Sequence, residues 1–270
     1  MTVCLPIRFS ERSELSPEET SAVKALAAAC KAADCFDPCL NFDTNLNVVP
    51  GIPAWRLAWA ESAAGPRLCS GPPGLEVEAS GKGILAGAAS FFAPGTAEAE
   101  ISACVSPVFR HQGIFSSLFN GLAAPLKAHG FPSIVLVAES AAPLGAAIAA
   151  HLGAFLSRSE YQMRLEPEQI VKRTGTSGVR LIPVTTDTVD TMVRLSTECF
   201  GETEDDARSF TLNMLQDPSR EMFVARNDSG PVGTVALARD AEGYMIHGLG
   251  VLPGSRRQGL GGAILDCAIS

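Results

Sequence analysis

The pattern of hydrophobic and polar positions predicts strands and helices in the first half of the chain. Short apolar or alternating runs predict strands over residues 5–9, 54–60, 84–92, 98–105 and 134–137. Apolar positions at helical spacing predict helices from residue 16, over residues 114–129 and over residues 143–152. A last pair of strands is expected over residues 155–165, around Arg158.

Local signals refine this pattern. Pro6 confines the first strand to the edge of a sheet. Ser16, followed by a proline and two glutamates, marks a helix start. The continuous apolar run at residues 134–137 is typical of a strand that is buried on both faces. Residues 35–53 are expected to be irregular, and residues 64–80 are expected to form a surface turn.

The second half shows a similar pattern with fewer elements. Strands are predicted over residues 179–184, 222–226, 231–238 and 244–251, and helices over residues 188–200, 205–215 and from 259 onward. The counterpart of the last strand, helix and strand pair of the first half is missing. We therefore expect either a shortened chain or an incomplete second domain, and an incomplete sheet has an aggregation-prone edge.

One window joins a strand end to a glycine-rich turn and a helix start. Residues 251–265 read V-L-P-G-S-R-R-Q-G-L-G-G-A-I-L. The first N–H groups of a helix lack intrahelical partners and carry partial positive charge. Glycine lets an anion approach the backbone, and arginine offers forked donors to phosphate. The window predicts an anion site at a helix start; a plain glycine turn with two solvated arginines is the alternative.

A second copy of this window strengthens the prediction. Residues 105–119 read V-S-P-V-F-R-H-Q-G-I-F-S-S-L-F. Matched positions lie 146 residues apart: Val105 and Val251, Pro107 and Pro253, Arg110 and Arg256, Gln112 and Gln258, Gly113 and Gly259, and upstream Gly87 and Gly233. Two copies this far apart predict two domains, over residues 1–167 and 178–270, with a polar linker over residues 168–177.

The windows carry a resemblance to a known family. Arg256-x-x-Gly259-x-Gly261 resembles the Q/R-x-x-G-x-G/A signature of the GNAT superfamily of N-acetyltransferases. Arg110-x-x-Gly113-x-Phe115 departs from it at the last position. The chain thus resembles a tandem acetyltransferase. The implied fold is α/β (α+β), with two tandem GNAT-like domains, each a twisted mixed sheet flanked by helices. The central strand of each would end at Val105 or Val251, and the second domain would be incomplete at its C-terminus.

The resemblance implies acetyl-CoA as cofactor, with its pyrophosphate on the helix start and its pantetheine arm beside the preceding strand. In the first copy the implied contacts are Cys104, Val105, Arg110, His111, Gln112, Gly113, Ile114 and Phe115. In the second copy they are Gly250, Val251, Arg256, Arg257, Gln258, Gly259, Leu260, Gly261 and Gly262. No metal is required. We expect binding in the first domain, because the second lacks strands that would wall the pantetheine arm.

Candidate catalytic residues lie on the strands that enter the turns. Glu98 and Glu100 alternate with alanines and therefore point to one face. The resemblance favours a glutamate base here, and Glu100 is the first choice; solvent-facing carboxylates are the alternative. In the second copy the strand carries Glu242 and His247. A histidine base and a structural histidine both remain open there.

Two further regions bear on chemistry through the resemblance. The position at which the family often has a tyrosine acid holds Ala149, and Tyr161 lies on a different element. The first copy therefore departs from the family pattern. The segment over residues 35–53 corresponds to part of the acceptor pocket, which makes Phe36, Phe42 and Asp43 candidate substrate contacts. A solvated loop with anchoring aromatics is the alternative.

The composition and net charge of the chain exclude some classes of binding partner. The chain has 270 residues, of which 46% are hydrophobic and 19% charged, a globular balance. A net charge of −8 argues against nucleic acid and favours a cationic substrate. No window has the length of a signal peptide core or a membrane span, so we expect a cytoplasmic protein with reduced cysteines and no membrane partner. Cys30, Cys35 and Cys39 lack metal spacing and are expected to be buried.

Two functions remain. The first is an N-acetyltransferase that moves an acetyl group from acetyl-CoA to a primary amine of a small molecule or peptide by direct attack. The second is a non-catalytic, regulatory acyl-CoA-binding protein. A Rossmann fingerprint is excluded because Gly248-Leu249-Gly250 has no third glycine in place. The sequence leaves the acceptor, the catalytic domain and the oligomeric state open.

Overall fold

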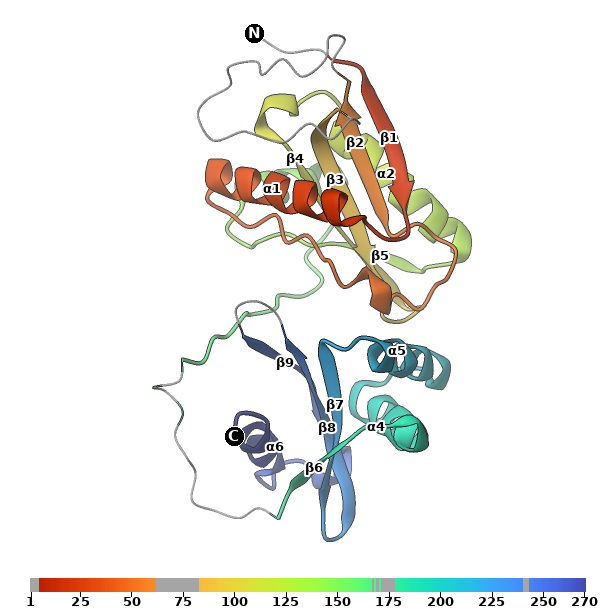
Figure 1. The fold of residues 1–270 in the computed structure, drawn as a ribbon, viewed down its shortest axis with the longest axis vertical. Helices are drawn as coiled ribbons and strands as arrows, with labels where there is room; N and C mark the ends of the chain where they lie inside the picture. The colour runs from red at the N-terminus through yellow and green to blue at the C-terminus, as the bar shows by residue number, and fades with distance from the viewer. Residues whose placement is uncertain (1–4, 62–82, 167, 169, 171–177, 240–242) are drawn as a thin grey trace. The chain divides into compact units, whose positions relative to one another are not determined.

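The chain folds into two compact units, and the boundary between them along the sequence falls between residues 160 and 161 (Figure 1). The computed structural model describes residues 5–61, 83–166, 168, 170, 178–239 and 243–270. The turn expected over residues 64–80, most of the linker expected over residues 168–177, and Glu242 lie outside the described residues. Each unit is described by itself below.

The first unit is built on a five-stranded sheet. In spatial order its strands are β1 (Ile7–Arg12), β2 (Trp55–Ala60), β3 (Ile84–Phe92), β4 (Glu98–Val105) and β5 (Ser133–Leu136). The first four pair antiparallel, whereas β5 runs parallel to β4. The strand β1 lies at the edge of the sheet, as Pro6 predicts. The sheet is thus mixed, and its one parallel pair follows from the crossover between β4 and β5.

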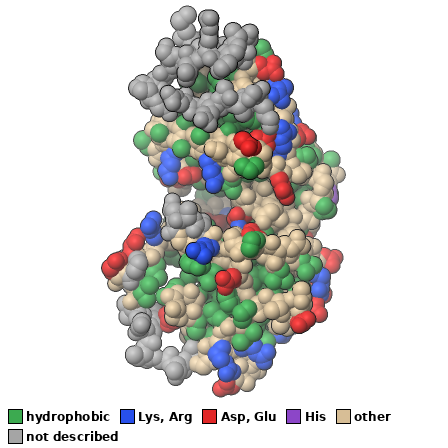
Figure 2. Space-filling model, in the orientation of Figure 1, with side chains coloured by type: hydrophobic (Ala, Val, Ile, Leu, Met, Phe, Trp, Pro, Cys, Tyr) green, Lys and Arg blue, Asp and Glu red, His purple; other side chains and the backbone are tan. Residues whose placement is uncertain are grey.

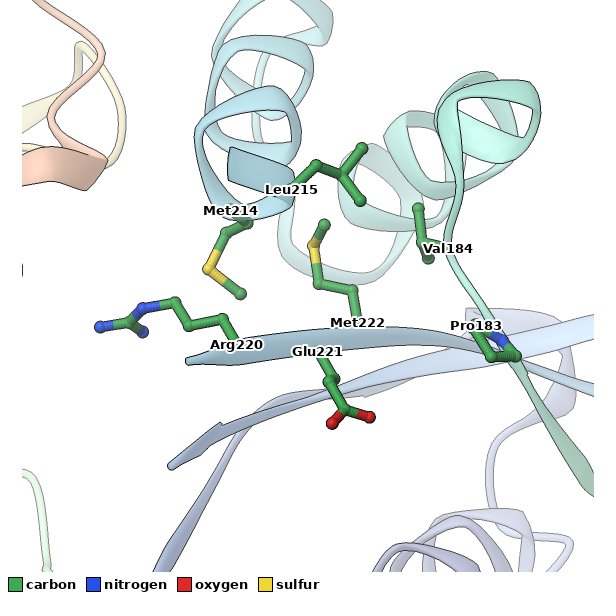
Figure 3. Close-up of a pocket in the computed structure, with 7 residues that line it drawn as sticks. All are labelled: Pro183, Val184, Met214, Leu215, Arg220, Glu221 and Met222. Carbon is green, nitrogen blue, oxygen red and sulfur yellow. The ribbon is translucent and has the colours of Figure 1, made fainter. Parts of the chain in front are cut away.

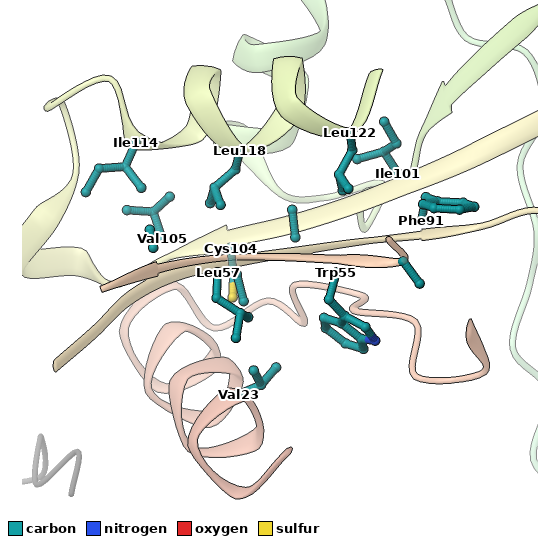
Figure 4. Packing of buried hydrophobic residues seen from close by; sticks show 14 of the residues in the cluster. Val23, Trp55, Leu57, Phe91, Ile101, Cys104, Val105, Ile114, Leu118 and Leu122 are labelled. Atoms are coloured by element: carbon teal, nitrogen blue, oxygen red, sulfur yellow. The ribbon is translucent and has the colours of Figure 1, made fainter. Parts of the chain in front are cut away.

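Two long helices cover opposite faces of this sheet (Figure 1). They are α1 (Pro17–Asp34), which starts with a capping box of Ser16 and Glu19, and α2 (Ile114–His129), which ends at Gly130. Figure 4 shows Ile101 and Val105 on the α2 side and Cys104 on the α1 side. The described residues of the unit also form the short helices η1 (Thr44–Leu46), η2 (Pro107–Phe109) and α3 (Pro143–His151).

The second unit is built on a four-stranded sheet. Its strands, in spatial order, are β6 (Arg180–Pro183), β7 (Arg220–Asn227), β8 (Gly230–Arg239) and β9 (Tyr244–Val251), and neighbours pair antiparallel. The helices are η4 (Thr186–Thr188), α4 (Val189–Phe200), α5 (Glu204–Gln216) and α6 (Leu260–Ala268). Helices α4 and α5 lie on one face and α6 on the other. Within the described residues, β9 is an edge strand, and Figure 2 shows hydrophobic side chains gathered on the visible face of this unit.

Three predictions about the first unit are wrong. Residues 155–165 form no strand, and Phe155 is 88% exposed, because no neighbouring strand offers them backbone partners. The strand β5 is only half-buried, because it is the last strand of its sheet. Cys35 is exposed, because it caps α1 in the left-handed conformation (φ 62°) beyond the buried stripe of the helix. Cys30 is buried as predicted.

The glycines that share the 146-residue offset mark close approaches. A Cβ at Gly87 would lie 3.0 Å from Cδ1 of Leu118, on the helix α2. A Cβ at Gly233 would lie 2.2 Å from the carbonyl oxygen of Gly250 and 3.0 Å from Cδ1 of Ile264, on α6. Both positions therefore need glycine so that the helix after the turn can pack tightly onto its sheet.

We expect Gly233→Ala to lower the free energy of unfolding of the second unit by about 1–3 kcal/mol, the usual cost of overpacking. Gly87→Ala should cost less, because its nearest neighbour is the end of a flexible leucine side chain. Gly254→Ala is the matched control, since its Cβ would enter open space. Urea unfolding followed by amide hydrogen exchange measures each unit. Equal stability of the Gly233 and Gly254 variants would contradict the close-approach account.

Candidate active site

The two predicted turns have the same backbone conformation. After β4 and the short helix η2 (Pro107–Phe109), His111 (φ 61°) and Gly113 (φ 76°) are left-handed. After β9 and η5 (Pro253–Ser255), Arg257 (φ 60°) and Gly259 (φ 78°) repeat the pattern. Such alternating conformations turn successive N–H groups into a concave anion cradle. The repeated sequence therefore encodes a repeated cradle.

Both cradles are open at the helix start. Neither α2 nor α6 has a side-chain cap on its first turn, and the N-cap residues are Gly113 and Gly259. A Cβ at either glycine would meet nothing within 4 Å. The N–H groups at these helix starts are thus available to an incoming anion, and the helix dipole favours negative charge there.

The first arginine of each turn is tied to the protein. Arg110 donates from Nε to the Val105 carbonyl (3.1 Å) and from Nη1 and Nη2 to the two Asp34 carboxylate oxygens (2.7 and 2.6 Å). Arg256 donates from Nε to the Val251 carbonyl (3.0 Å) and from Nη2 to the Cys199 carbonyl (3.3 Å). These hydrogen bonds fix each turn to the end of the preceding strand and to a helix. That helix is α1 in the first unit and α4 in the second.

The end of β4 has a free side. Ser106 donates to the Ala86 carbonyl (2.9 Å), whereas Val137 donates to the Ile101 carbonyl (3.1 Å). Backbone groups of even-numbered residues therefore face β3, and those of odd-numbered residues face β5. Pairing with β5 stops at Ile101, so the groups of Ala103 and the N–H of Val105 face a side that no described strand occupies. The strand β4 extends past the end of β5 and leaves an open backbone edge that leads to the cradle.

Cys104 does not contribute to this free side. Its backbone pairs with Ala88 on β3, and its thiol is buried against Cys30 on α1. The hydrogen bond between the two thiols lowers the pKa of Cys30 and raises that of Cys104. At the matching position, a Cβ on Gly250 would lie 2.7 Å from the Phe200 ring. In the first unit the Cys104 side chain therefore packs against α1, whereas in the second unit the Phe200 ring of α4 takes the place of a side chain at Gly250.

A row of polar side chains follows β4 on its α1 face, and it begins with two carboxylates. Arg158 binds Glu98 through Nη1 and Glu100 through Nη2, each at 2.6 Å, and Glu160 through Nε at 2.9 Å. The predicted common direction of Glu98 and Glu100 is therefore confirmed. Burial raises the pKa of Glu100, and the Arg158 charge partly offsets that shift.

The irregular segment before β2 is fastened beside this row. Asn41 donates from its backbone to Ser102 Oγ (3.1 Å) and accepts from Ser90 Oγ (2.9 Å). Phe42 packs on Trp55, with ring centroids 5.2 Å apart. The candidate acceptor contact Phe42 is held against β2 and stays 37% exposed, and the segment places Asn41 beside Ser102 on β4.

A separate hollow of about 130 Å³ lies in the second unit between α5 and β7. Figure 3 shows Met214, Leu215 and Met222 turned toward one another, whereas Glu221 points to the other side of the strand. Ligand pockets usually exceed about 300 Å³, so this hollow is a packing gap away from the cradle. Among the described residues, no cluster of histidine, cysteine or carboxylate side chains is arranged to hold a metal. No described helix has the length and apolarity to cross a membrane.

Comparison with known proteins gives a family match for part of the chain and a fold match for nearly all of it. Residues 189–270 match the sequence model of the acetyltransferase (GNAT) family. The chain aligns with a GCN5-related N-acetyltransferase from Sphaerobacter thermophilus at a TM-score of 0.57 and 20% identity, over 97% of this chain and 82% of the other. It aligns with a tandem GNAT protein from the clavulanic acid biosynthesis pathway, solved without acetyl-CoA, at a TM-score of 0.56 and 16% identity, over 95% and 82%. No curated protein sequence matches significantly.

Residues 189–270 match the GNAT family, and the whole chain has the tandem fold of these two solved structures. After that fold, its two compact units are called the first and the second GNAT unit. Proteins of this family typically bind acetyl-CoA, and the open cradle of the first GNAT unit fits a pyrophosphate. Glu98 and Glu100 lie on the strand β4, and the turn over residues 105–113 directly follows that strand. His247 is half-buried on β9, in the second GNAT unit.

Sequence reasoning missed two partners of the site in the first GNAT unit. Asp34, at the end of α1, binds Arg110. Arg158, in an irregular segment, binds both candidate bases. Neither partner lies in a motif, although the acidic residue at the end of α1 and the arginines after α3 were visible charge signals. The second GNAT unit uses a backbone carbonyl where the first uses Asp34.

We expect Asp34→Asn to lower the free energy of unfolding by about 1–2 kcal/mol, because it removes a charge-assisted bidentate pair that is mostly shielded from solvent. Asp37→Asn is the control: its partner Lys31 is 62% exposed, and such pairs contribute about 0–1 kcal/mol. Urea unfolding at neutral pH measures both variants. Equal losses would mean that the Arg110–Asp34 pair does not hold the turn.

Proposed function

We propose that this protein is an N-acetyltransferase that transfers an acetyl group from acetyl-CoA to a primary amine of a small molecule or peptide by direct attack. The observation that carries the proposal is the order of features along β4. Two carboxylates, an open backbone edge and an anion cradle follow one another on a single strand. Such an arrangement can place an amine beside a base while it holds a phosphorylated acyl carrier.

The first GNAT unit is the proposed cofactor site. Its β4 has a parallel neighbour, β5, and extends past the end of that strand, so the backbone edge near Ala103 and Val105 is free. In the second GNAT unit, β9 has no such neighbour among the described residues. The Phe115 ring stacks on Phe119, with centroids 6.0 Å apart and planes 10° apart, and is held along α2. When bound, acetyl-CoA supplies the thioester whose acetyl group is transferred.

Glu100 is the proposed base. An acceptor ammonium gives a proton to the Glu100 carboxylate, and the neutral nitrogen forms a bond to the acetyl carbon as the carbon–sulfur bond breaks. The nitrogen then loses its second proton to solvent, and the leaving sulfur takes a proton from solvent, because the position for a tyrosine acid holds Ala149 and Tyr161 is 87% exposed. A raised pKa makes Glu100 a stronger base than an ordinary glutamate.

The absence of that tyrosine favours one other function, a regulatory protein that binds acyl-CoA without turnover. Both functions need the cradle, and only the first needs Glu100. Release of free thiol from acetyl-CoA in the presence of a panel of amines therefore separates them. The catalytic role of His247 in the second GNAT unit is tested in the same assay with His247→Gln.

We expect Gly113→Glu to abolish acetyl-CoA binding, because a side chain at a left-handed N-cap places a carboxylate where the pyrophosphate sits. Gly259→Glu is the matched variant in the second cradle, and it should leave binding largely intact. Calorimetric titration of the 270-residue chain with acetyl-CoA measures both. Loss of binding only in the Gly259 variant would reverse the ranking of the two cradles.

We expect Glu100→Gln to lower turnover by about 10²–10⁴, the usual loss for a general base, with little change in acetyl-CoA affinity. Wild-type activity should fall as the pH drops through the raised pKa of Glu100, because only the carboxylate accepts the proton. The stability linkage has the opposite sign: a raised pKa in the folded state favours folding at low pH, and that contribution is lost as the pH rises through it.

The pH profile provides the control. Glu98→Gln keeps Glu100 and should retain the acid limb of the rate profile. An unchanged rate in the Glu100 variant would exclude it as the base and would leave Glu98 or a non-catalytic first unit.

A further inference from the structure

We propose that Arg158 is an internal stand-in for the acceptor's cation: it occupies the site formed by Glu98 and Glu100, and an acceptor ammonium binds there by displacing it. This inference rests on the proposed function, because it names the subsite that the acceptor's charged group would take.

The geometry of the Arg158 contacts is that of a cation seated between two acids. One guanidinium nitrogen binds Glu98 and the other binds Glu100, each at 2.6 Å. A primary ammonium carries three donors and can bridge the same two oxygens. The side chains of Glu98 and Glu100 are 35% and 26% exposed, and that of Arg158 is 39% exposed. Solvent therefore reaches the site, and exchange of one cation for another needs no opening of the core.

The segment that carries Arg158 has little else to hold it. Ala154 donates to the Ala149 carbonyl (2.9 Å), and within residues 155–165 the structure shows no further backbone hydrogen bond. The apolar side chains of Phe155 and Leu156, which would normally anchor a segment by burial, are 88% and 83% exposed. Among the described contacts of residues 155–165, the Arg158 ion pairs are what fastens this segment to the sheet.

The ion pairs of Arg158 with Glu98 and Glu100 are weak enough for another cation to replace Arg158. Ion pairs that are partly exposed to water contribute little stability, and ordering an extended segment has an entropic cost. A freely diffusing ammonium that binds the same carboxylates avoids that cost. Arg158 thus offsets part of the negative charge of the two acids until an acceptor arrives, and its departure breaks the ion pairs between its segment and β4.

The charges around the site select the acceptor. Glu98, Glu100 and Glu160 all converge on Arg158. A carboxylate next to the acceptor amine would face these three acids and be repelled. The structure therefore favours an aliphatic primary amine or diamine that has no carboxylate on the neighbouring carbons, and it disfavours a free amino acid.

The test uses 1,4-diaminobutane as the probe and isothermal titration calorimetry of the full chain at low salt. Arg158→Gln should bind the probe about tenfold more tightly than the wild type, since a competing internal cation is gone. Arg164→Gln is the matched control: it lies in the same segment, pairs with Glu166 and is 76% exposed. It should bind the probe as the wild type does, and so should Arg158→Lys, which keeps a cation in place.

Two further arms locate the site and its selectivity. Adding Glu98→Gln to Arg158→Gln should remove the gain in affinity, because the bridging pair is broken. The probe 4-aminobutanoate, which exchanges one amine for a carboxylate, should show a smaller gain than the diamine. Circular dichroism checks that each variant is folded.

The outcomes separate this inference from the proposed function. If Arg158→Gln gains no more affinity than Arg164→Gln, the stand-in role is overturned, whatever the enzyme does. Thiol release from acetyl-CoA is followed in the same variants. A gain in probe affinity without turnover by any variant supports the cation site and overturns the acetyltransferase proposal, whereas turnover without the gain does the reverse.

Discussion

The architecture of each unit depends on one contact, the hydrogen bond from the first arginine of the turn to the last carbonyl of the preceding strand. Arg110 reaches Val105 at 3.1 Å, and Arg256 reaches Val251 at 3.0 Å. This contact ends the strand and orients the next residues so that two of them adopt positive φ. The helix can then begin with uncapped N–H groups. From the sequence, Arg110 and Arg256 resemble phosphate ligands. In the structure each one instead bonds the backbone of its own turn, whose N–H groups form the cradle.

The two copies have the same turn, but the first arginine of the turn binds a different partner in each. In the first, the arginine is neutralised by Asp34; in the second, it meets the Cys199 carbonyl. A carbonyl carries only a partial charge, so Arg256 keeps more of its positive charge beside its cradle. The second cradle is the more electropositive, whereas the first has a parallel neighbour strand and a row of acids. The two units therefore surround the same turn with different groups.

The acids on β4 show how one guanidinium offsets part of a concentrated negative charge. Two carboxylates on alternate positions of one strand repel each other, and burial adds to the cost of the charge on Glu100. The chain resolves this with a guanidinium from an otherwise loosely held segment. That solution is electrostatic and local, and it leaves the hydrophobic core between α1, the sheet and α2 untouched (Figure 4).

The sequence by itself determined the features that depend on neighbours along the chain. The spans of β3, β4 and β9, the Ser16 cap and both turns follow from periodicity and from residues with special backbone preferences. Only the tertiary structure decided the pairs far apart in the chain, such as Arg110 with Asp34 and Arg158 with Glu100, 76 and 58 residues apart. It also decided that residues 155–165 are not strands, because a strand exists only where a neighbour supplies its hydrogen bonds.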